Sequence, residues 1–446
     1  MAKKSTLFVC QTCGAAQPKW LGRCPACQSW DTMVEEPMAP AAKGRPAAPV
    51  HKTPLTQALD RPDKRRPTGL PELDRVLGGG LVAGMVVLVG GEPGIGKSTL
   101  MLQTAQALGA DGGRVLYVAA EESARQVGLR AHRLGLAGEG VELLADTALE
   151  PILQAVAADT HDAVVVDSIQ ALKSEELSSA PGSVGQVRQC AAELAGAAKK
   201  AGCALFLVGH VTKEGALAGP RVLEHMVDTV LYFESEPSMR LRLLRAVKNR
   251  FGATDEVGVF EMGEAGLAGV VNPSALFLAH RPISAPGSAV CAAMSGTRPL
   301  LVEVQALVSP SGLAMPRRQA LGVDQGRLQM LAAVLAIHAG LDLGGHDVFV
   351  NVTGGVRLSE PAADLAVTAA IASSLANRPL PAKTVCFGEV GLTGELRAVG
   401  RSAARMAEAL RQGFDQVLTA PGKTAAPAGL EVLKAGRLDQ ALGLLW

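Results

Sequence analysis

The sequence predicts an α/β protein with several domains, and three patterns support this prediction. From Thr68 to about Pro273, short apolar runs alternate with stretches of helical character, as in a parallel sheet flanked by helices. A glycine-rich segment follows one of the first runs, and two pairs of cysteines precede them. With 446 residues, 48% of them hydrophobic, the chain can bury two or three cores.

The charge of the sequence is unevenly placed. The net charge is only +1, but residues 1–70 hold eleven Lys and Arg against five acidic residues. Such a segment either suits an anionic partner or forms a solvated tail. The N-terminus, Met1–Lys4, leads into cysteines rather than an apolar signal core, and no run of about 18 apolar residues follows. We therefore expect a cytoplasmic protein without a membrane span.

The first four cysteines form a metal-binding pattern, Cys-x₂-Cys-x₁₀-Cys-x₂-Cys. In a chain without an export signal, this spacing indicates a metal rather than disulfides. Two thiolate pairs close a tetrahedron with no open position, so the site is structural; Zn²⁺ is expected, with rubredoxin-like iron as the alternative. We assign as ligands, within a module at residues 1–34, Cys10, Cys13, Cys24 and Cys27. The other cysteines are expected to be buried, unreactive thiols: Cys190, Cys203, Cys291 and Cys386.

Composition divides the rest of the chain. Residues 35–67 contain seven prolines among Ala, Lys and Arg, with no apolar periodicity, which is typical of a flexible basic linker. The alternating pattern then defines a domain at 68–273. Breaks at Asn272-Pro273 and at 281–287 precede a third domain at 285–446.

The glycine-rich segment predicts a site for a nucleoside triphosphate. Residues Gly91 to Ser98 satisfy G-x-x-x-x-G-K-[ST] between an apolar run at 85–89 and a helix start, a context that disfavours a chance glycine-rich turn. Glycines let backbone N–H groups point at phosphate oxygens. We expect Lys97 to neutralise the β- and γ-phosphates and Ser98 to ligate Mg²⁺. The ATP-binding loop comprises Gly91, Glu92, Pro93, Gly94, Ile95, Gly96, Lys97, Ser98 and Thr99.

Hydrolysis also requires polar groups at neighbouring strand ends. We expect strands at 85–89, 115–119, 163–167, 204–208, 229–233, 241–247 and 257–261. Asp167 ends an apolar strand and is expected to hold the Mg²⁺ shell, rather than being an ordinary strand-end Asp. Glu121 is the first choice to orient the attacking water, with Glu122 as its competitor. His210 follows another strand and is either a γ-phosphate sensor or a structural histidine.

This order of groups resembles the core shared by RecA recombinases and DnaB-type replicative helicases. A pentapeptide narrows the resemblance: Lys248, Asn249, Arg250, Phe251 and Gly252. Together with the cysteine module, the P-loop and the third domain, it resembles the bacterial RadA (Sms) DNA repair proteins over essentially the whole chain. The resemblance implies a RecA-like fold and a hexameric ring, in which Lys248 and Arg250 reach the γ-phosphate of the neighbouring subunit. On sequence alone they would be two solvated basic residues.

Two loops resemble the DNA-binding loops of RecA-like rings. They are residues 173–188, after Asp167, and residues 211–222, after His210. Their candidate phosphate contacts are Lys173, Lys213 and Arg221. Both loops lack aromatic residues for base stacking, so we expect little sequence preference. The alternative is that both are plain solvated loops.

Residues from about 290 onward resemble the proteolytic domain of Lon, through segments 349–355 and 387–395. Strands are expected near 300–308, 347–353 and 384–388, and helices near 325–340, 361–376 and 401–413. Lon pairs a serine nucleophile with a lysine base, but here Ala362 takes the expected serine position and residues 400–405 contain no lysine. Ser359 and Ser402 are then ordinary polar residues, and we expect an inactive scaffold that supports a ring. Three arginines either face duplex DNA or form subunit salt bridges: Arg317, Arg318 and Arg327.

The resemblance implies a DNA-dependent ATPase that acts in recombinational repair of damaged DNA. It would be a ring-shaped helicase or translocase that promotes branch migration with the RecA recombinase, on single-stranded and branched DNA. The expected cofactors are ATP, Mg²⁺ and Zn²⁺. Two other functions remain open: a Lon-type ATP-dependent protease, and a nucleotide-switched binding module without motor action.

Overall fold

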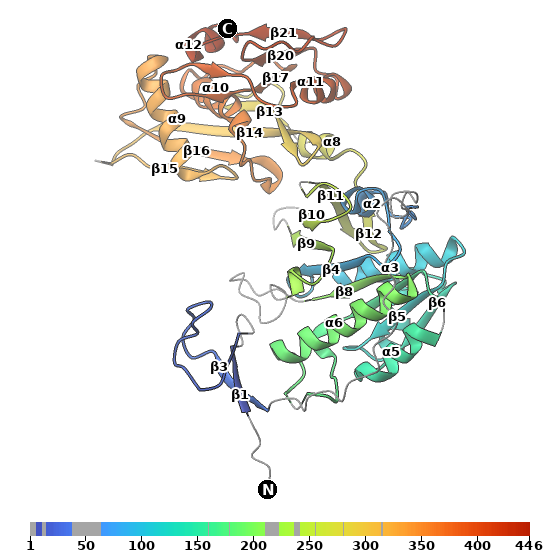
Figure 1. Cartoon of the computed structure of the whole chain (residues 1–446). Coiled ribbons are helices and arrows are strands. Elements are labelled where there is room, and N and C mark those ends of the chain that lie inside the picture. The colour runs from blue at the N-terminus through green and yellow to red at the C-terminus, as the bar shows by residue number, and fades with distance from the viewer. Residues whose placement is uncertain are drawn as a thin grey trace. The chain divides into compact units, whose positions relative to one another are not determined.

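A computed structural model of the chain describes residues 6–10, 15–37, 64–158, 160–177, 179–209, 223–235, 241–254, 256–279, 281–313 and 315–446 (Figure 1). Contacts divide the chain into two compact units, of which the first continues to Gly269 and the second begins at Val270. No helix in these ranges is long and apolar enough to cross a membrane.

The N-terminal module is a small antiparallel sheet with a core made largely of cysteine. Its strands, in the order β2-β1-β3, are β1 (Thr6–Cys10), β2 (Ala16–Gln17) and β3 (Met33–Pro37). The buried cluster consists of Cys10, Cys24 and Met33, with Phe8 and Cys27 packed against it. This cluster contains too few apolar side chains to stabilise the module, so the module needs a metal to fold.

The first unit is organised by a nine-stranded sheet in the order β12-β11-β10-β9-β4-β8-β7-β5-β6. Its strands are β4 (Val86–Gly91), β5 (Val115–Ala119), β6 (Val141–Leu144), β7 (Ala163–Asp167), β8 (Ala204–Val208), β9 (Thr229–Ser235), β10 (Leu241–Asn249), β11 (Val257–Gly263) and β12 (Gly266–Gly269). The six strands from β9 to β6 are parallel, as predicted. The sheet is extended by β10, β11 and β12, which are antiparallel because the connections between them are too short for a crossover.

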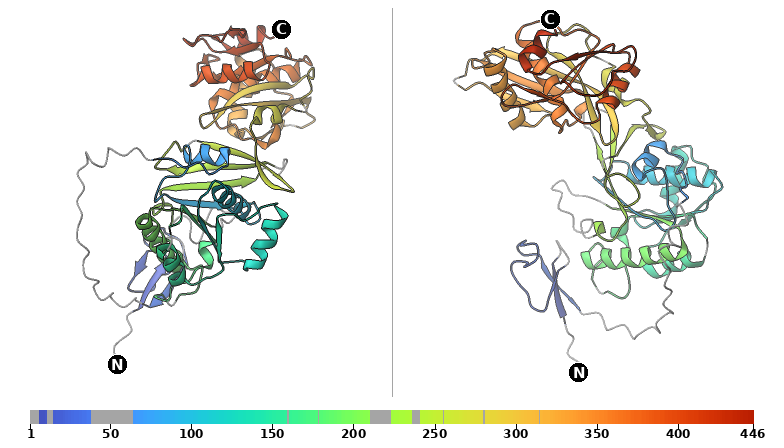
Figure 2. Two further views of the ribbon diagram at one scale, coloured as in Figure 1. Left: turned by 90° about the vertical axis from the view of Figure 1, so that its right-hand side faces the viewer. Right: turned by 45° about the horizontal axis from the view of Figure 1, so that its top comes forward.

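Helices cover both faces of this sheet. On one face lie α2 (Pro71–Leu77), α3 (Lys97–Ala110) and α4 (Ala124–Arg133), and on the other lie η1 (Ile169–Ala171), α5 (Leu149–Ala158) and α6 (Val184–Ala201). Figure 2 shows blue α2 and green α6 on opposite sides of the strands. Along β4, Val87 and Val89 enter the first core and Val86 and Leu88 the second, so the whole strand is apolar.

The second unit contains a seven-stranded mixed sheet in the order β15-β16-β14-β13-β17-β20-β21. Its strands are β13 (Ser288–Ser295), β14 (Arg298–Pro310), β15 (Arg318–Leu321), β16 (His346–Val352), β17 (Thr384–Phe387), β20 (Gln416–Thr419) and β21 (Glu431–Lys434), with a separate ribbon of β18 (Glu389–Val390) and β19 (Leu396–Arg397). The break expected at Asn272-Pro273 is a helix start, because the Asn272 side chain caps α8 (Pro273–Leu278) by accepting from the Ala275 N–H.

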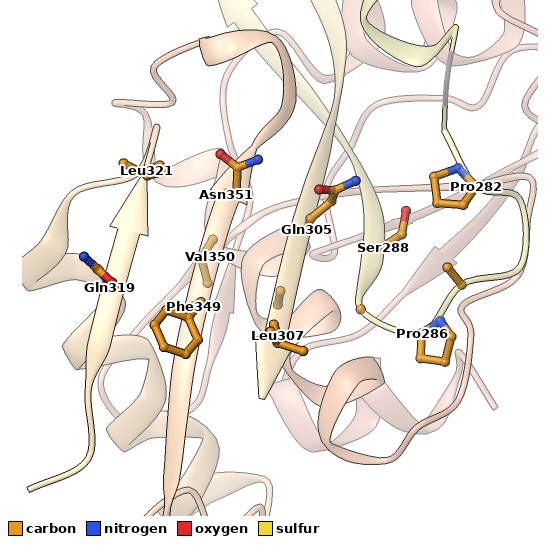
Figure 3. Close-up of a pocket in the computed structure, with 13 residues that line it drawn as sticks. Pro282, Pro286, Ser288, Gln305, Leu307, Gln319, Leu321, Phe349, Val350 and Asn351 are labelled. Atoms are coloured by element: carbon orange, nitrogen blue, oxygen red, sulfur yellow. The ribbon is translucent and has the colours of Figure 1, made fainter. Parts of the chain in front are cut away.

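The central helix of this unit is α10 (Asp364–Leu375), which packs on β13, β14 and β17. The remaining elements are α9 (Gln325–His338), η2 (Thr353–Gly355), η3 (Pro361–Ala363), α11 (Ser402–Arg411) and α12 (Leu438–Gly443). Near the β15 edge, side chains from β14, β15 and β16 line an open cavity of about 400 Å³, bordered by Pro282 and Pro286 (Figure 3). Gln305, Phe349 and Asn351 are among its lining residues, and none of the described residues that line it is charged.

Candidate nucleotide and metal sites

The P-loop connects the carboxyl end of β4 to the first residue of α3. Gly94 and Gly96 have φ angles of 75° and 115°, which favour glycine, and a Cβ at Gly96 would lie 2.6 Å from the Met262 Cε. No side chain caps the start of α3, so its first N–H groups are oriented for an anion. Outside the loop, Arg242 donates from Nε to the Ile95 carbonyl at 3.2 Å, a contact that the sequence did not reveal.

Lys97 is buried against the loop itself. Its Nζ donates to the carbonyl oxygens of Gly91 and Glu92, at 2.8 and 2.9 Å. Burial lowers the pKa of Lys97, and the negative charges of Asp167 and Glu121 partly oppose this shift. The lysine thus lies among the carboxylates that the sequence predicted at the neighbouring strand ends.

Asp167 ends β7 and faces a tyrosine that the sequence analysis missed. The Tyr117 hydroxyl donates to the Asp167 Oδ2 at 2.7 Å. Burial, followed by the charge of Asp167, raises the pKa of Tyr117 well above its ordinary value, so its hydroxyl stays a neutral donor. The only sequence signal was a hydroxyl within the otherwise apolar run at 115–119.

The two candidate glutamates have different partners. The Ser168 hydroxyl donates to the Glu121 carboxylate, and the Ala120 N–H donates to the Asp167 carbonyl at 2.8 Å. Glu122 instead forms an ion pair with Arg130 of α4. Of the two glutamates, Glu121 contacts Ser168, the residue after Asp167, and its charge acts on Lys97.

The oxygen donors at this site fit Mg²⁺. The Asp167 carboxylate is half-buried at the strand end, and Ser98 is half-buried in the first turn of α3. A carboxylate and a hydroxyl are ligands that Mg²⁺ takes alongside the phosphates of a nucleotide.

The pentapeptide from Lys248 to Gly252 follows a β-bulge in β10. Ala246 is paired with Leu231 and Lys248 with Val230, so Val247 is an extra residue. Before the bulge, Ala246 packs into the core beneath α2. After it, Asn249 takes that face and donates from Nδ2 to the Val76 carbonyl at 3.1 Å.

Lys248 and Arg250 consequently lie toward the opposite face. The Lys248 Nζ donates to the carbonyls of Glu224 and Val227 at 2.7 and 2.8 Å, and Arg250 forms an ion pair with Asp228 at 3.3 Å. Asp228 accepts from the N–H of Val86, the first residue of β4. The P-loop begins at the other end of this strand, about 17 Å away at ~3.3 Å per residue. The structure therefore does not bring Lys248 and Arg250 to the P-loop of their own chain.

The rest of the pentapeptide stabilises this turn. The Phe251 N–H donates to the Asn249 Oδ1 at 2.9 Å, and a Cβ at Gly252 would lie 3.0 Å from the Gly78 Cα. These contacts hold the end of β10 against the end of α2.

The loop after Asp167 is built around a glutamine that was not foreseen. Gln186 is fully buried, and its Nε2 donates to the carbonyls of Ser174, Leu177 and Ser179, each at 3.1 Å. Lys173 is exposed at the start of this loop. Three further predicted residues, His210, Lys213 and Arg221, lie outside the described residues.

The cysteine module fits a zinc ion. The Sγ atoms of Cys10, Cys24 and Cys27 lie within 4.8 Å of one another, and those of Cys10 and Cys27 are 3.6 Å apart. A tetrahedral site with Zn–S bonds of ~2.3 Å needs sulfurs about 3.8 Å apart. The fourth predicted ligand, Cys13, lies outside the described residues.

In the second unit, the positions compared with the Lon dyad hold no Ser–Lys pair. Ala362 is buried, and Arg405, 2% exposed, forms two hydrogen bonds to Glu360 at 2.8 and 2.5 Å. The Ser402 hydroxyl donates to the Val399 carbonyl at 2.8 Å, and Ser359 is exposed. An ion pair between buried Arg405 and half-buried Glu360 thus occupies the place where a base would be needed.

The three arginines considered for DNA contact differ in their partners. Arg327 forms an ion pair with Asp364 and also donates to the Val390 carbonyl at 3.0 Å. Arg318 is half-buried and donates to the carbonyls of Leu343 and His346. The side chain of Arg317 is exposed. Two of the three therefore stabilise their own domain.

Comparison with known proteins agrees with both sites. Residues 52–216 match the AAA domain family and residues 8–35 match the rubredoxin metal binding domain, which imply ATP with Mg²⁺ and Zn²⁺ as the ligands. A solved KaiC-like protein from Pyrococcus horikoshii is 22% identical over 47% of this chain and 100% of its own, with a TM-score of 0.40.

Curated relatives match the entire chain. The DNA repair protein RadA of Pseudomonas aeruginosa is 52% identical and covers 100% of both chains. That of Bacillus subtilis is 49% identical and covers 99% of both. With such identity over its full length, an AAA domain and a rubredoxin-type metal binding domain, the chain belongs to the RadA family of DNA repair proteins.

Proposed function

We propose that this protein is a ring-shaped, DNA-dependent ATPase that acts as a helicase or translocase and promotes branch migration of recombination intermediates with a RecA recombinase. The observation that carries the proposal is the separation of two groups of catalytic residues. Lys97, Asp167 and Glu121 cluster at one end of β4, whereas Lys248 and Arg250 lie at the other.

This separation favours a site shared between subunits. A cation on the γ-phosphate stabilises the charge of the transition state, but Arg250 cannot span the length of β4 to its own P-loop. A neighbouring subunit can supply it. Such a contact is head-to-tail, so repeating it gives a ring where the rotation between subunits closes and a filament where it does not; we propose the closed, hexameric form.

Within each site, the residues take separate roles. Lys97 binds the phosphates, Ser98 and Asp167 hold Mg²⁺, and Glu121 orients the attacking water. Glu122 is unsuited to the last role because Arg130 engages its carboxylate. His210 is assigned as a γ-phosphate sensor on its position after β8.

DNA is proposed to pass along the loops that follow β7 and β8. Lys173 would contact the phosphate backbone, together with Lys213 and Arg221. Gln186 holds the carbonyls of Ser174, Leu177 and Ser179, so less conformational entropy is lost when this loop binds a strand. We assign the domains as a zinc module at 1–34, a linker at 35–67, an ATPase domain at 68–273 and a Lon-like scaffold at 285–446. In the scaffold, the exposed Arg317 is the candidate contact for duplex DNA.

Mixing two inactive variants tests the shared site. Lys97→Ala should lose nucleotide binding, and Arg250→Ala should bind ATP but not hydrolyse it with single-stranded DNA. Mixed rings contain interfaces with an intact Lys97 from one subunit and an intact Arg250 from the next, so the mixture should regain ATPase activity. Arg245→Ala is the matched control, because Arg245 lies on β10, the strand that Arg250 follows, and pairs with Glu234 at the surface.

Several results would contradict the proposal. Full activity of Arg250→Ala would remove the shared site, and a mixture as inactive as its components would place both residues in one chain's site. An ATPase rate that does not respond to any DNA would exclude the motor. Strand displacement on forked DNA and branch migration with RecA test the remaining steps.

A further inference from the structure

Asp228 is a buried carboxylate at the start of β4. It is 4% exposed, and its Oδ2 accepts from the Val86 N–H at 3.1 Å. Two backbone bonds also fix it: its N–H donates to the Val86 carbonyl at 2.9 Å, and its carbonyl accepts from the Arg250 N–H at 3.1 Å. The carboxylate therefore stays in place while side chains around it move.

Two cations from different elements meet at this carboxylate. Arg250 approaches from the end of β10 at 3.3 Å, and Lys199 from the end of α6 at 3.4 Å. Their side chains are 59% and 49% exposed. Both can thus leave the carboxylate without disturbing a packed core, whereas Asp228 cannot follow them.

We propose that Asp228 holds Arg250 in its resting position and that Lys199 replaces Arg250 when the arginine moves to a phosphate of the neighbouring subunit. The inference rests on the proposed role of Arg250. Asp228 and Lys199 are positioning residues, since they act through Arg250 and touch no nucleotide themselves.

The physical reason is the cost of a buried charge without a partner. If Arg250 left an otherwise unpaired Asp228, the carboxylate, which the Val86 N–H holds in place, would lose its counter-ion at a largely buried position. Lys199 is already within ion-pair distance, so the charge stays neutralised after Arg250 departs. A nucleotide phosphate presents more charge than one carboxylate and binds guanidinium in two-bond geometry, which favours the exchange.

The inference predicts different effects on kcat for the two positioning residues. In Lys199→Ala, release of Arg250 leaves the Asp228 carboxylate without a counter-ion. The kcat for DNA-stimulated ATP hydrolysis should therefore fall about tenfold, while the KM for ATP changes less than about twofold. Lys199→Arg keeps a cation and should hydrolyse ATP like the unmodified protein. Asp228→Asn still accepts from the Val86 N–H but holds no cation, so it should not lower kcat.

The decisive variant combines the two substitutions. Because an amide at this position carries no charge that needs a counter-ion, the substitution Asp228→Asn should restore kcat in the Lys199→Ala background. Lys200→Ala is the matched control, because Lys200 is the exposed next residue of α6. If the double variant is as slow as Lys199→Ala, or if Lys199→Ala behaves like Lys200→Ala, the exchange does not occur.

Arg250→Ala, measured in parallel, separates this failure from that of the proposed function. If Arg250→Ala hydrolyses ATP normally, the shared site itself is wrong. If it is inactive while Lys199→Ala is normal, only the exchange is wrong. Should Asp228→Asn fail to fold, the contrast between Lys199→Ala and Lys199→Arg still decides the outcome.

Discussion

Replacing Tyr117 with phenylalanine would remove one hydroxyl from the candidate Mg²⁺ site while leaving the packing of β5 intact. That hydroxyl donates to the Asp167 Oδ2 at 2.7 Å, and the ring is 1% exposed. Because burial raises the pKa of Tyr117 well above its usual range, the hydroxyl donates at every pH at which the ATPase would be assayed. Tyr117→Phe therefore removes a hydrogen bond that orients the carboxylate, without removing a charge.

The size of the effect follows from the setting of the bond. A hydrogen bond to a charged group contributes ~1.5–3 kcal/mol. Asp167 is only half-buried, so water replaces part of the lost bond and the lower figure applies. About 1.5 kcal/mol corresponds to roughly a tenfold weaker hold on Mg²⁺, within the range typical of partners of metal ligands.

The assay is the ATPase rate at saturating ATP and single-stranded DNA as free Mg²⁺ is varied. In Tyr117→Phe the half-maximal Mg²⁺ concentration should rise about tenfold. The chain has one other tyrosine, Tyr232, whose hydroxyl donates to Glu224 at 3.0 Å, so Tyr232→Phe is the natural control. If both variants show the same Mg²⁺ dependence as the unmodified protein, Tyr117 does not orient the metal ligand and the assignment of Asp167 is weakened.

Three further predictions concern stability and the cysteines. Arg405→Met takes the cation away from Glu360, which is 25% exposed, so the second unit should lose about 3 kcal/mol. Urea unfolding followed by amide protection of α10 and β14 should show a lower midpoint, and an unchanged midpoint would contradict this. Burial raises the pKa of Cys190 to about 12, so at pH 8 its thiolate fraction is ~10⁻⁴ and it should alkylate about a thousandfold more slowly than an ordinary thiol, which mass spectrometry can measure. Chelation of zinc should unfold the module around Cys10 and Cys24, seen as a loss of amide protection there, while nucleotide binding at Lys97 persists.

The sequence was most informative where structure and chemistry are local. β4 is buried on both faces, so Val86–Val89 form an unbroken apolar run, and the P-loop directly follows it. Strands at the sheet edges were missed for the opposite reason. In β15, Gln319 and Leu321 are exposed, so the strand has no apolar face to mark it.

The contacts of the site depend on strand order, which one sequence does not reveal. Tyr117 meets Asp167, and Glu121 meets Ser168, only because β5 and β7 are neighbours in the sheet. The sequence placed Glu121 ahead of Glu122 but kept both as candidates, since the ion pair that distinguishes them depends on Arg130 in α4. Each of these pairings joins residues that the chain itself keeps apart.

The bulge at Val247 determines which side chains of the pentapeptide lie on each face of the sheet. Side chains of a strand alternate between two faces, so the extra residue decides which letters of the motif face α2 and which face Asp228. Deleting Val247 would leave Lys248 to Gly252 intact as a string yet exchange the faces of Asn249 and Arg250. Among relatives or designed variants, a preserved pentapeptide is therefore informative only together with its distance from the preceding strand.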